Sequence, residues 1–384
     1  MTKPEAVPLA EPDLRGNEAL YLQRCLESGW ISSIGPFVSD FERRLADFVG
    51  VPHALTTGNG TVALHLALAA LRIGPGDEVI VPDLTFAATA NAVIYCGATP
   101  VMVDVLPDDW NLDPAAVAAA VTPRTKAILP VHLYGHPCRL DEILHIAKAA
   151  ELYVVEDAAE SLGSRYHERP SGSHGDIACF SFYGNKLITT GEGGACVTSK
   201  PELHERMSFL RDHGMNKKKR YWHDEVGFNY RITSLQAAIG LAQMERIGEL
   251  LAAKRRNAEL YRQGLAGLGL EMSDELPGAF SSYWMFNVLL PEAIDRAELM
   301  RALAEQGIDT RCVFYPLHQM PPYQRYVRPG QEFPVSDRLS ARGLSLPSAT
   351  TLRQDQIERV CATLRGLLGE SSWATAKSEP ITTS

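Results

Sequence analysis

The chain has 384 residues, of which 45% are hydrophobic and 22% charged, a composition typical of a soluble globular protein with a large buried core. Its 37 Lys and Arg against 46 Asp and Glu give a formal net charge of −9, so the overall charge attracts neither nucleic acid nor an anionic membrane. Nucleic acid is therefore excluded as the main partner, whereas a local basic patch could still bind a small phosphorylated ligand.

The seven cysteines are scattered and include no CxxC pair, which argues against a disulfide scaffold and against a structural zinc site. We predict buried thiols in a reducing compartment. Residues 1–16 carry acids and prolines instead of the apolar stretch of a secretory signal. No run approaches the ~18 uninterrupted apolar residues of a membrane helix. The sequence therefore predicts a cytoplasmic protein without a membrane partner.

The first 250 residues alternate between short apolar runs and stretches of helical periodicity. Helices are expected after Gly60 and at 85–95 and 139–150. Apolar, often β-branched runs separated by helices predict a mostly parallel sheet covered on both faces. The fold class is therefore α/β, and the predicted strands are 53–57, 78–82, 99–105, 125–132, 152–158, 176–182 and 194–199.

From Thr233 onward the pattern changes to one long helical stretch, residues 234–268. Strand and helix signals then alternate with proline-marked turns, which predicts a smaller α+β domain joined to the first by the long helix. We place the large domain at 1–248 and the small one at 249–370. The polar, aperiodic residues 371–384 are predicted to be a loose tail. The later elements are expected at 281–290, 296–306, 307–316 and 355–368.

Several familiar motifs are incomplete. Residues 58–63 fit the GxGxxA dinucleotide fingerprint, but Asp77 precedes the second strand, whereas the fingerprint needs an acid at its end. The same helix start still offers backbone N–H groups to a phosphate. No GxxxxGK[ST] accompanies the acid-ended strand 152–158, which excludes an ATPase. His132 and His136 lack a third ligand at metal spacing, so no metal is predicted.

One lysine and one aspartate are harder to dismiss. Asp157 ends an apolar strand, so its carboxylate should lie at the carboxyl edge of the sheet, where α/β proteins bind ligands. Lys186 follows strand 176–182 between glycines, although alone it would be interpreted as a surface residue. Together with the helix-start phosphate site, the set matches the needs of pyridoxal phosphate (PLP). A lysine forms the Schiff base, an aspartate keeps the pyridine nitrogen protonated, and N–H groups with a hydroxyl bind the phosphate.

Several ordered motifs strengthen this interpretation. They are GWISSIGPFVSDFE, GNGTVALHLAL, PDLTFAATANAV, VEDAAES, FSFYGNK with TTGEGG, and GFNYRITSLQAAIG, all within residues 29–240, with YPLHQMPPY at 315–323. With them the chain resembles a DegT-type nucleotide-sugar aminotransferase, an aspartate-aminotransferase-like enzyme of PLP fold type I. Residues 220–231, with DAAE and GNK, are most similar to perosamine synthases, which aminate GDP-4-keto-6-deoxymannose.

The resemblance implies a role for each cofactor residue. Lys186 forms the Schiff base with PLP, and Asp157 pairs with the pyridine nitrogen. Gly60 and Thr61 supply backbone N–H groups to the phosphate, and Ser181 supplies its hydroxyl.

Three further cofactor contacts are implied in the same way. Phe86 stacks on the cofactor ring, although alone it would be interpreted as a core phenylalanine. Glu160 lies near the opposite ring face, where many relatives have Gln or His. Asn229 reaches the phosphate of the neighbouring subunit, which implies an obligatory homodimer with shared sites.

The substrate contacts are implied by a basic run and a loop of the small domain. Residues 216–220 read NKKKR, a pattern usually found on solvated faces, but a nucleotide diphosphate needs cations. Arg220, next to Tyr221, is the first candidate. Tyr315 and His318 match a loop that approaches the sugar in relatives.

The implied reaction is transamination. An amino donor, L-glutamate by family analogy, converts PLP to pyridoxamine phosphate (PMP), which then aminates the 4-keto carbon of a nucleotide-linked sugar while Lys186 moves the proton. A UDP- or dTDP-linked keto sugar, or an inosose, remains an alternative acceptor. A non-catalytic PLP-binding regulatory protein is disfavoured by the intact Lys186, Asp157 and Ser181. Relatives that dehydrate a sugar have histidine in place of the lysine, which argues against that branch.

Overall fold

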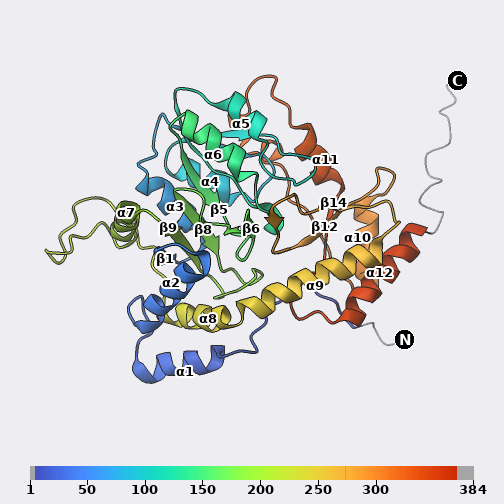
Figure 1. The fold of residues 1–384 in the computed structure, drawn as a ribbon, viewed down its shortest axis with the longest axis horizontal. Coiled ribbons are helices and arrows are strands. Elements are labelled where there is room, and N and C mark those ends of the chain that lie inside the picture. The colour runs from blue at the N-terminus through green and yellow to red at the C-terminus, as the bar shows by residue number, and fades with distance from the viewer. Residues whose placement is uncertain (1–4, 273, 370–384) are drawn as a thin grey trace.

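The computed structural model describes residues 5–272 and 274–369. Figure 1 shows a larger unit built around a central sheet and a smaller one beside it. The helices are α1 (Glu18–Ser28), α2 (Pro36–Val49), α3 (Gly60–Ala70), α4 (Ala88–Tyr95), α5 (Pro114–Ala120), α6 (Leu140–Ala149), α7 (Pro201–Arg211), α8 (Ser234–Glu245), α9 (Ile247–Leu265), α10 (Arg296–Glu305), α11 (Pro334–Arg342) and α12 (Gln354–Gly369).

The large sheet has seven strands in the order β1-β9-β8-β5-β4-β2-β3. Only β9 runs antiparallel to its neighbours, β1 and β8, so the predicted mostly parallel sheet is confirmed. Its strands are β1 (His53–Thr57), β2 (Glu78–Pro82), β3 (Thr99–Val103), β4 (Thr125–Ile128), β5 (Tyr153–Asp157), β8 (Ile177–Ser181) and β9 (Gly194–Thr198).

Two smaller sheets complete the fold. A four-stranded sheet lies in the smaller unit, and a three-stranded one joins residues near 165–170 to a strand near 280. Their strands are β10 (Glu271–Met272), β12 (Phe286–Leu289), β14 (Gly343–Leu346) and β13 (Arg311–Cys312), and β11 (Ala279–Phe280), β6 (Arg165–Tyr166) and β7 (Arg169–Pro170). In the described part of the chain, three short 3-10 helices lie in connecting loops, at η1 (Leu133–Gly135), η2 (Leu317–Gln319) and η3 (Gln324–Tyr326).

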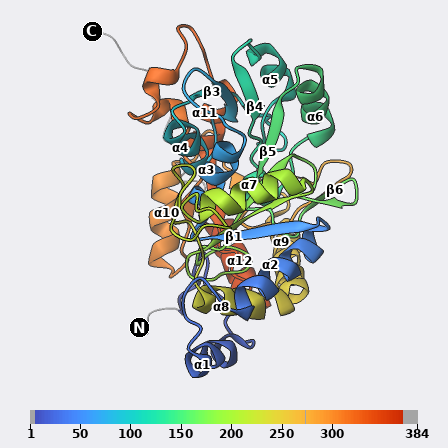
Figure 2. The same ribbon diagram turned by 90° about the vertical axis from the view of Figure 1, so that its left-hand side faces the viewer.

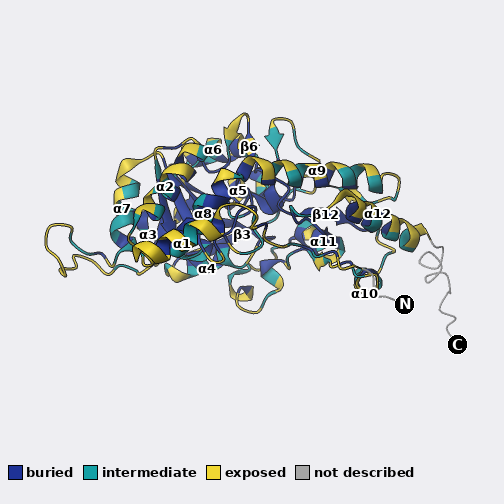
Figure 3. Cartoon of the chain, turned by 90° about the horizontal axis from the view of Figure 1, so that it is seen from below, coloured by how far each residue is buried: buried dark blue, intermediate teal, exposed yellow. Residues whose placement is uncertain are grey.

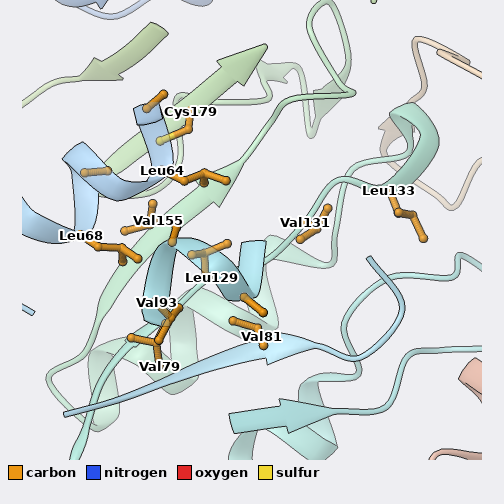
Figure 4. Close-up of a cluster of buried hydrophobic side chains, with 14 of the residues drawn as sticks. Leu64, Leu68, Val79, Val81, Val93, Leu129, Val131, Leu133, Val155 and Cys179 are labelled. Atoms are coloured by element: carbon orange, nitrogen blue, oxygen red, sulfur yellow. The ribbon is translucent and has the colours of Figure 1, made fainter. Parts of the chain in front are cut away.

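The core follows from the two-residue period of the strands. Val79 and Val81 of β2 point into one cluster with α3 and α4 (Figure 4). Ile80, between them, points into another cluster with α5 and α6. At the other end of the sheet, α2 and α8 cover the face opposite α3. Figure 3 shows the strands buried between helices whose outer faces are exposed. The sheet is thus a middle layer whose loops remain free to form a site.

The predicted helix 234–268 is wrong in one respect, because it is broken at Arg246 into α8 and α9 (Figure 2). Arg246 has φ −107° and ψ 5°, and its guanidinium donates to Asp13 over 3.1 and 3.2 Å. Gln243 also donates to the Asp13 carbonyl, at 2.8 Å. The N-terminal segment therefore fixes the break, through contacts between residues more than 200 positions apart that helical periodicity does not reveal.

Other element boundaries also differ from the predicted ones. The helix predicted at 85–95 begins only at Ala88, and the strand predicted at 307–316 is reduced to Arg311–Cys312. The strand predicted at 281–290 is Phe286–Leu289, because Ser281 and Ser282 instead form hydrogen bonds to loops of the larger unit. The boundary at 248 and 249 stays a prediction. Val7 pairs with Ile308, so the described N-terminal residues begin beside the smaller unit.

All seven cysteines are free thiols, and five of them are buried. Among the described residues, no helix is long and apolar enough to cross a membrane. The predicted C-terminal tail, residues 371–384, lies outside the described residues.

Glu156, next to Asp157 in β5, is fully buried and tightly bonded. Its oxygens accept backbone N–H groups of Gly172, His174 and Gly175 at 2.6–2.8 Å and face His132 Nε2 at 3.0 Å. His132 Nδ1 accepts the Cys138 N–H, so Nε2 carries the proton. Burial raises the pKa of Glu156, but the hydrogen bond from His132 and the backbone donors outweigh this effect and lower the pKa to about 2. Of the two histidines considered as metal ligands, His132 is thus hydrogen-bonded to Glu156, and His136 lies in the loop directly after η1.

We expect Glu156→Gln to lower the free energy of unfolding at pH 7 by roughly 2–4 kcal/mol, because its amide group would face backbone donors that now reach a carboxylate. The carboxylate stabilises the fold above its unfolded pKa, 4.5, and this contribution disappears as the pH falls towards about 2. Urea unfolding of both proteins across this range is the measurement. A difference that does not shrink at low pH would contradict the assignment.

Candidate functional site

Lys186 lies in the loop after β8, and its side chain is only 13% exposed. Its Nζ lies 3.4 Å from Glu160 Oε1 and 3.6 Å from the ring centroid of Trp284. Burial lowers the pKa of Lys186, whereas the charges of Glu160 and Asp157 raise it. The predicted lysine is therefore an enclosed amine whose pKa is lowered, as a proton-transferring base requires.

Asp157 ends β5 at the carboxyl edge of the sheet and is 4% exposed. Its oxygens accept the Thr89 hydroxyl at 2.8 Å and the Ala159 N–H at 3.2 Å. Burial raises the pKa of Asp157, and these donors, with the charge of Lys186, act against the rise. The site thus holds a fixed acidic group that a cationic ligand atom would keep ionised.

The start of α3 meets the end of β8. Asn59 caps the helix by accepting the Val62 N–H, which leaves the first amides, of Gly60 and Thr61, to an external acceptor. A Cβ at Gly60 would lie 2.9 Å from the Cβ of Ser181. Gly60, Thr61 and Ser181, the residues predicted to bind the phosphate, therefore lie together. Only a glycine at position 60 allows α3 to come this close to the end of β8.

Phe86 and Glu160 occupy different surroundings. Phe86 is 58% exposed, and its ring centroid lies 5.7 Å from that of Phe314. Glu160 is buried, and its carboxylate joins Lys186 to the N–H of Tyr134, 2.7 Å away. Burial raises the pKa of Glu160, and the charge of Lys186 lowers it. Phe86 therefore offers an exposed aromatic face, whereas the carboxylate of Glu160 forms an ion pair with Lys186.

Arg220 and Tyr221 lie apart from Lys186 and Asp157, on an exposed arm, residues 213–229, that projects beyond α7 in Figure 1. Within the described chain they contact each other, with the guanidinium 4.9 Å from the Tyr221 ring. Asn229 lies exposed at the base of this arm, and its side-chain oxygen accepts from Arg231. One chain therefore does not bring these three residues into contact with Lys186.

The small-domain candidates also differ from each other. Tyr315 is 55% exposed. His318 faces Asp83 at 2.7 Å and Asp337 at 3.3 Å and stacks on Phe333. The bond to Asp83 raises the pKa of His318. Since Asp83 begins the loop that carries Phe86, His318 joins the smaller unit to that loop.

Sequence reasoning missed two residues at the centre of the site, Thr89 and Trp284. Thr89 lies four residues after Thr85 in the predicted helix 85–95, which is a weak signal of a polar helix face. In the structure Thr85 precedes α4, and the two hydroxyls are 3.0 Å apart. Trp284 lies in an apolar run that indicates only a buried strand. No local pattern could have placed it beside Lys186.

The residues present fit PLP. The chain joins a buried amine, a buried carboxylate and a helix N-terminus where Gly60 leaves room that a Cβ would fill. Lys186 would hold the cofactor aldehyde, Asp157 the pyridine nitrogen, and Gly60, Thr61 and Ser181 the phosphate. These are the three groups by which PLP is recognised.

Comparison with known proteins agrees with this geometry. Residues 12–365 match the DegT/DnrJ/EryC1/StrS aminotransferase family. The chain belongs to this family. It is 48% identical over 367 residues to a GDP-perosamine synthase of Caulobacter vibrioides, covering 94% of this chain and 98% of that protein. It is 44% identical to the GDP-perosamine synthase of Escherichia coli O157:H7, covering 93% and 97%.

The fold is similar as well. The structure of Spr1654 from Streptococcus pneumoniae in its PMP form matches with a TM-score of 0.90 and 29% identity, over 95% of this chain and 98% of that one. Membership of the DegT/DnrJ/EryC1/StrS family confirms the predicted fold type I architecture and a PLP-dependent nucleotide-sugar aminotransferase.

We expect Asp157→Asn to keep most of the cofactor affinity and to slow both half-reactions roughly 100-fold, or about 3 kcal/mol. Asparagine can still accept from Thr89, but it lacks the charge that would keep the pyridine nitrogen protonated. Single-turnover rates with the amino donor and with the keto sugar are the measurement. Rates close to wild type in both directions would refute the role of Asp157.

Proposed function

We propose that the chain transfers an amino group from L-glutamate to the 4-keto carbon of GDP-4-keto-6-deoxymannose, which yields GDP-perosamine. The observation that carries the chemistry is the enclosed Lys186 amine beside the buried Asp157. The GDP-sugar specificity is supported by the 48% identity to a GDP-perosamine synthase over nearly the full length of both chains.

Lys186 would hold the cofactor between reactions and, once released, move one proton between the donor carbon and the cofactor. When bound, PLP supplies the electron sink and carries the amino group between donor and acceptor. The lysine suits this work because burial lowers its pKa, so its neutral form is more accessible than that of an exposed lysine. Its 3.4 Å contact with Glu160 is long, so little hydrogen bonding opposes its movement.

The remaining candidates would position the ligands. Gly60, Thr61 and Ser181 would bind the cofactor phosphate, and Phe86 would cover one face of the ring. Glu160 would act through Lys186, because its carboxylate contacts the amine.

We also propose a homodimer in which each site is shared. Asn229 would reach the cofactor phosphate of the partner, and Arg220 and Tyr221 the nucleotide sugar, with Tyr315 and His318 near the sugar from the small domain. The proposal is supported by the arm of residues 213–229, whose tip exposes residues 217–220, KKKR, in an acidic protein. A nucleotide diphosphate is attracted by such cations.

Free cysteines throughout the chain also support a cytoplasmic enzyme.

The function is tested with purified protein, L-glutamate and a panel of GDP-, UDP- and dTDP-linked 4-keto-6-deoxy sugars. We expect the largest kcat/KM with GDP-4-keto-6-deoxymannose and none with Lys186→Ala, which should still bind PMP. Borohydride reduction and peptide mapping of the wild type should place the cofactor on Lys186. Preference for a UDP or dTDP sugar would overturn the proposed substrate, and a label on another lysine would overturn the site.

The shared site is tested with two inactive variants, Lys186→Ala and Asn229→Asp, the second of which sets a negative charge against the phosphate. In a mixed dimer with crossed sites, one site carries both lesions and the other neither. Co-refolding of equal amounts should therefore restore about a quarter of wild-type activity, since half the dimers are mixed and each has one intact site of two. If Asn229 serves its own chain, every site keeps one lesion and no activity returns.

A further inference from the structure

Trp284 lies directly beside the reactive amine, although it belongs to the C-terminal part of the chain. Its side chain comes from the stretch before β12 and is 5% exposed. Lys186 Nζ lies 3.6 Å from its ring centroid, and its indole Nε1 donates to the carbonyl of Asn185 at 2.7 Å. One side chain therefore contacts both the amine of Lys186 and the backbone that carries it.

Trp284 is itself held from three directions. The Tyr134 ring stacks on it, with centroids 6.2 Å apart and planes 11° apart. The buried Lys254 of α9 donates to its carbonyl at 2.8 Å. Gly135, with φ +99°, allows its backbone to approach, since a Cβ there would lie 2.8 Å from the Trp284 nitrogen. The indole is thus a fixed surface, and its position is set by both units of the fold.

We infer that Trp284 is a positioning residue for Lys186, whose free amine rests on the indole face between proton transfers. A cation is attracted to the face of an aromatic ring, and tryptophan is the strongest of the three rings. Within the described residues the only hydrogen-bond acceptor of Lys186 Nζ is Glu160, at 3.4 Å. The ring therefore keeps the amine in place without the directional bonds that would have to break when it moves.

The contact also acts on protonation. Burial lowers the pKa of Lys186, and the charges of Glu160 and Asp157 raise it. The indole face acts in the same direction as those carboxylates, because it stabilises the ammonium form. Trp284 would thereby limit the lowering of the Lys186 pKa by burial. The amine could then both accept and return a proton, as the proposed role of Lys186 as base and acid requires.

The inference rests on the role proposed for Lys186 and is tested on the PMP-loaded protein, in which that amine is free. We expect Trp284→Leu to lower the pKa of Lys186 by about one unit, the shift that loss of a desolvated cation–π contact implies. Competitive labelling with trace acetic anhydride across pH, followed by peptide mapping, measures this pKa directly. The rate of a single turnover should fall at a given pH, with little change in the KM for the nucleotide sugar.

Two further variants sharpen the test. Trp284→Phe keeps an aromatic face but loses the bond to Asn185, so the pKa should fall by roughly half as much. Tyr134→Phe keeps the stacked ring and loses only the bond that its hydroxyl accepts from the Phe314 N–H, so the Lys186 pKa should not move.

An unchanged or higher Lys186 pKa in Trp284→Leu overturns the inference. If that variant does not fold, as judged by circular dichroism, the phenylalanine variant decides by the same criterion. Failure of the proposed function is distinguishable, because it would show in the wild type as a reduced cofactor attached elsewhere than on Lys186.

Discussion

The structure depends on the burial of one amine and two carboxylates in a single water-poor space. Lys186, Asp157 and Glu160 are each costly to bury alone, since burial raises the pKa of both acids and lowers that of the lysine. Lys186 lowers this cost by its attraction to both acids, although the two acids repel each other, and the Thr89 hydroxyl and the Tyr134 N–H donate further hydrogen bonds to them. One amine cannot balance two carboxylates, so a ligand that brings a positive group to Asp157 would pair the remaining negative charge.

The sheet topology explains why these groups meet. β5 and β8 are adjacent and parallel, so Asp157 and the loop carrying Lys186 leave the same edge. The strand β9 runs antiparallel to both β1 and β8, so β1 and β8 run in the same direction. The helix α3, which follows β1, therefore starts at that edge too. The proposed cofactor anchors, which are far apart in the sequence, are thus placed by strand order, whereas Trp284 needs a second unit that reaches back through Ser281 and Ser282.

This difference also sets what the sequence could predict. Asp157 and Lys186 follow apolar strands and therefore carry a local signal of their position, and the GNG turn before α3 does as well. Thr89 and Trp284 lie inside helical and apolar patterns that indicate only burial. The break between α8 and α9 depends on Asp13, and the approach of Trp284 depends on the positive φ of Gly135. Both are consequences of tertiary contact, which periodicity does not encode.

The arm of residues 213–229 shows the opposite case, because the family resemblance assigns its residues a role that the contacts within one chain do not reveal. Its base is closed by two glycines, since a Cβ on Gly227 would lie 2.1 Å from the Gly214 nitrogen, and one on Gly214 would lie 2.3 Å from the Glu225 carbonyl oxygen. Farther out, Asp224 accepts from both Asn216 and Trp222. An exposed segment that is ordered in this way loses little conformational freedom when it meets a partner. The closely packed base therefore gives Arg220 and Tyr221 a defined direction away from their own chain, which is what the proposed shared site requires.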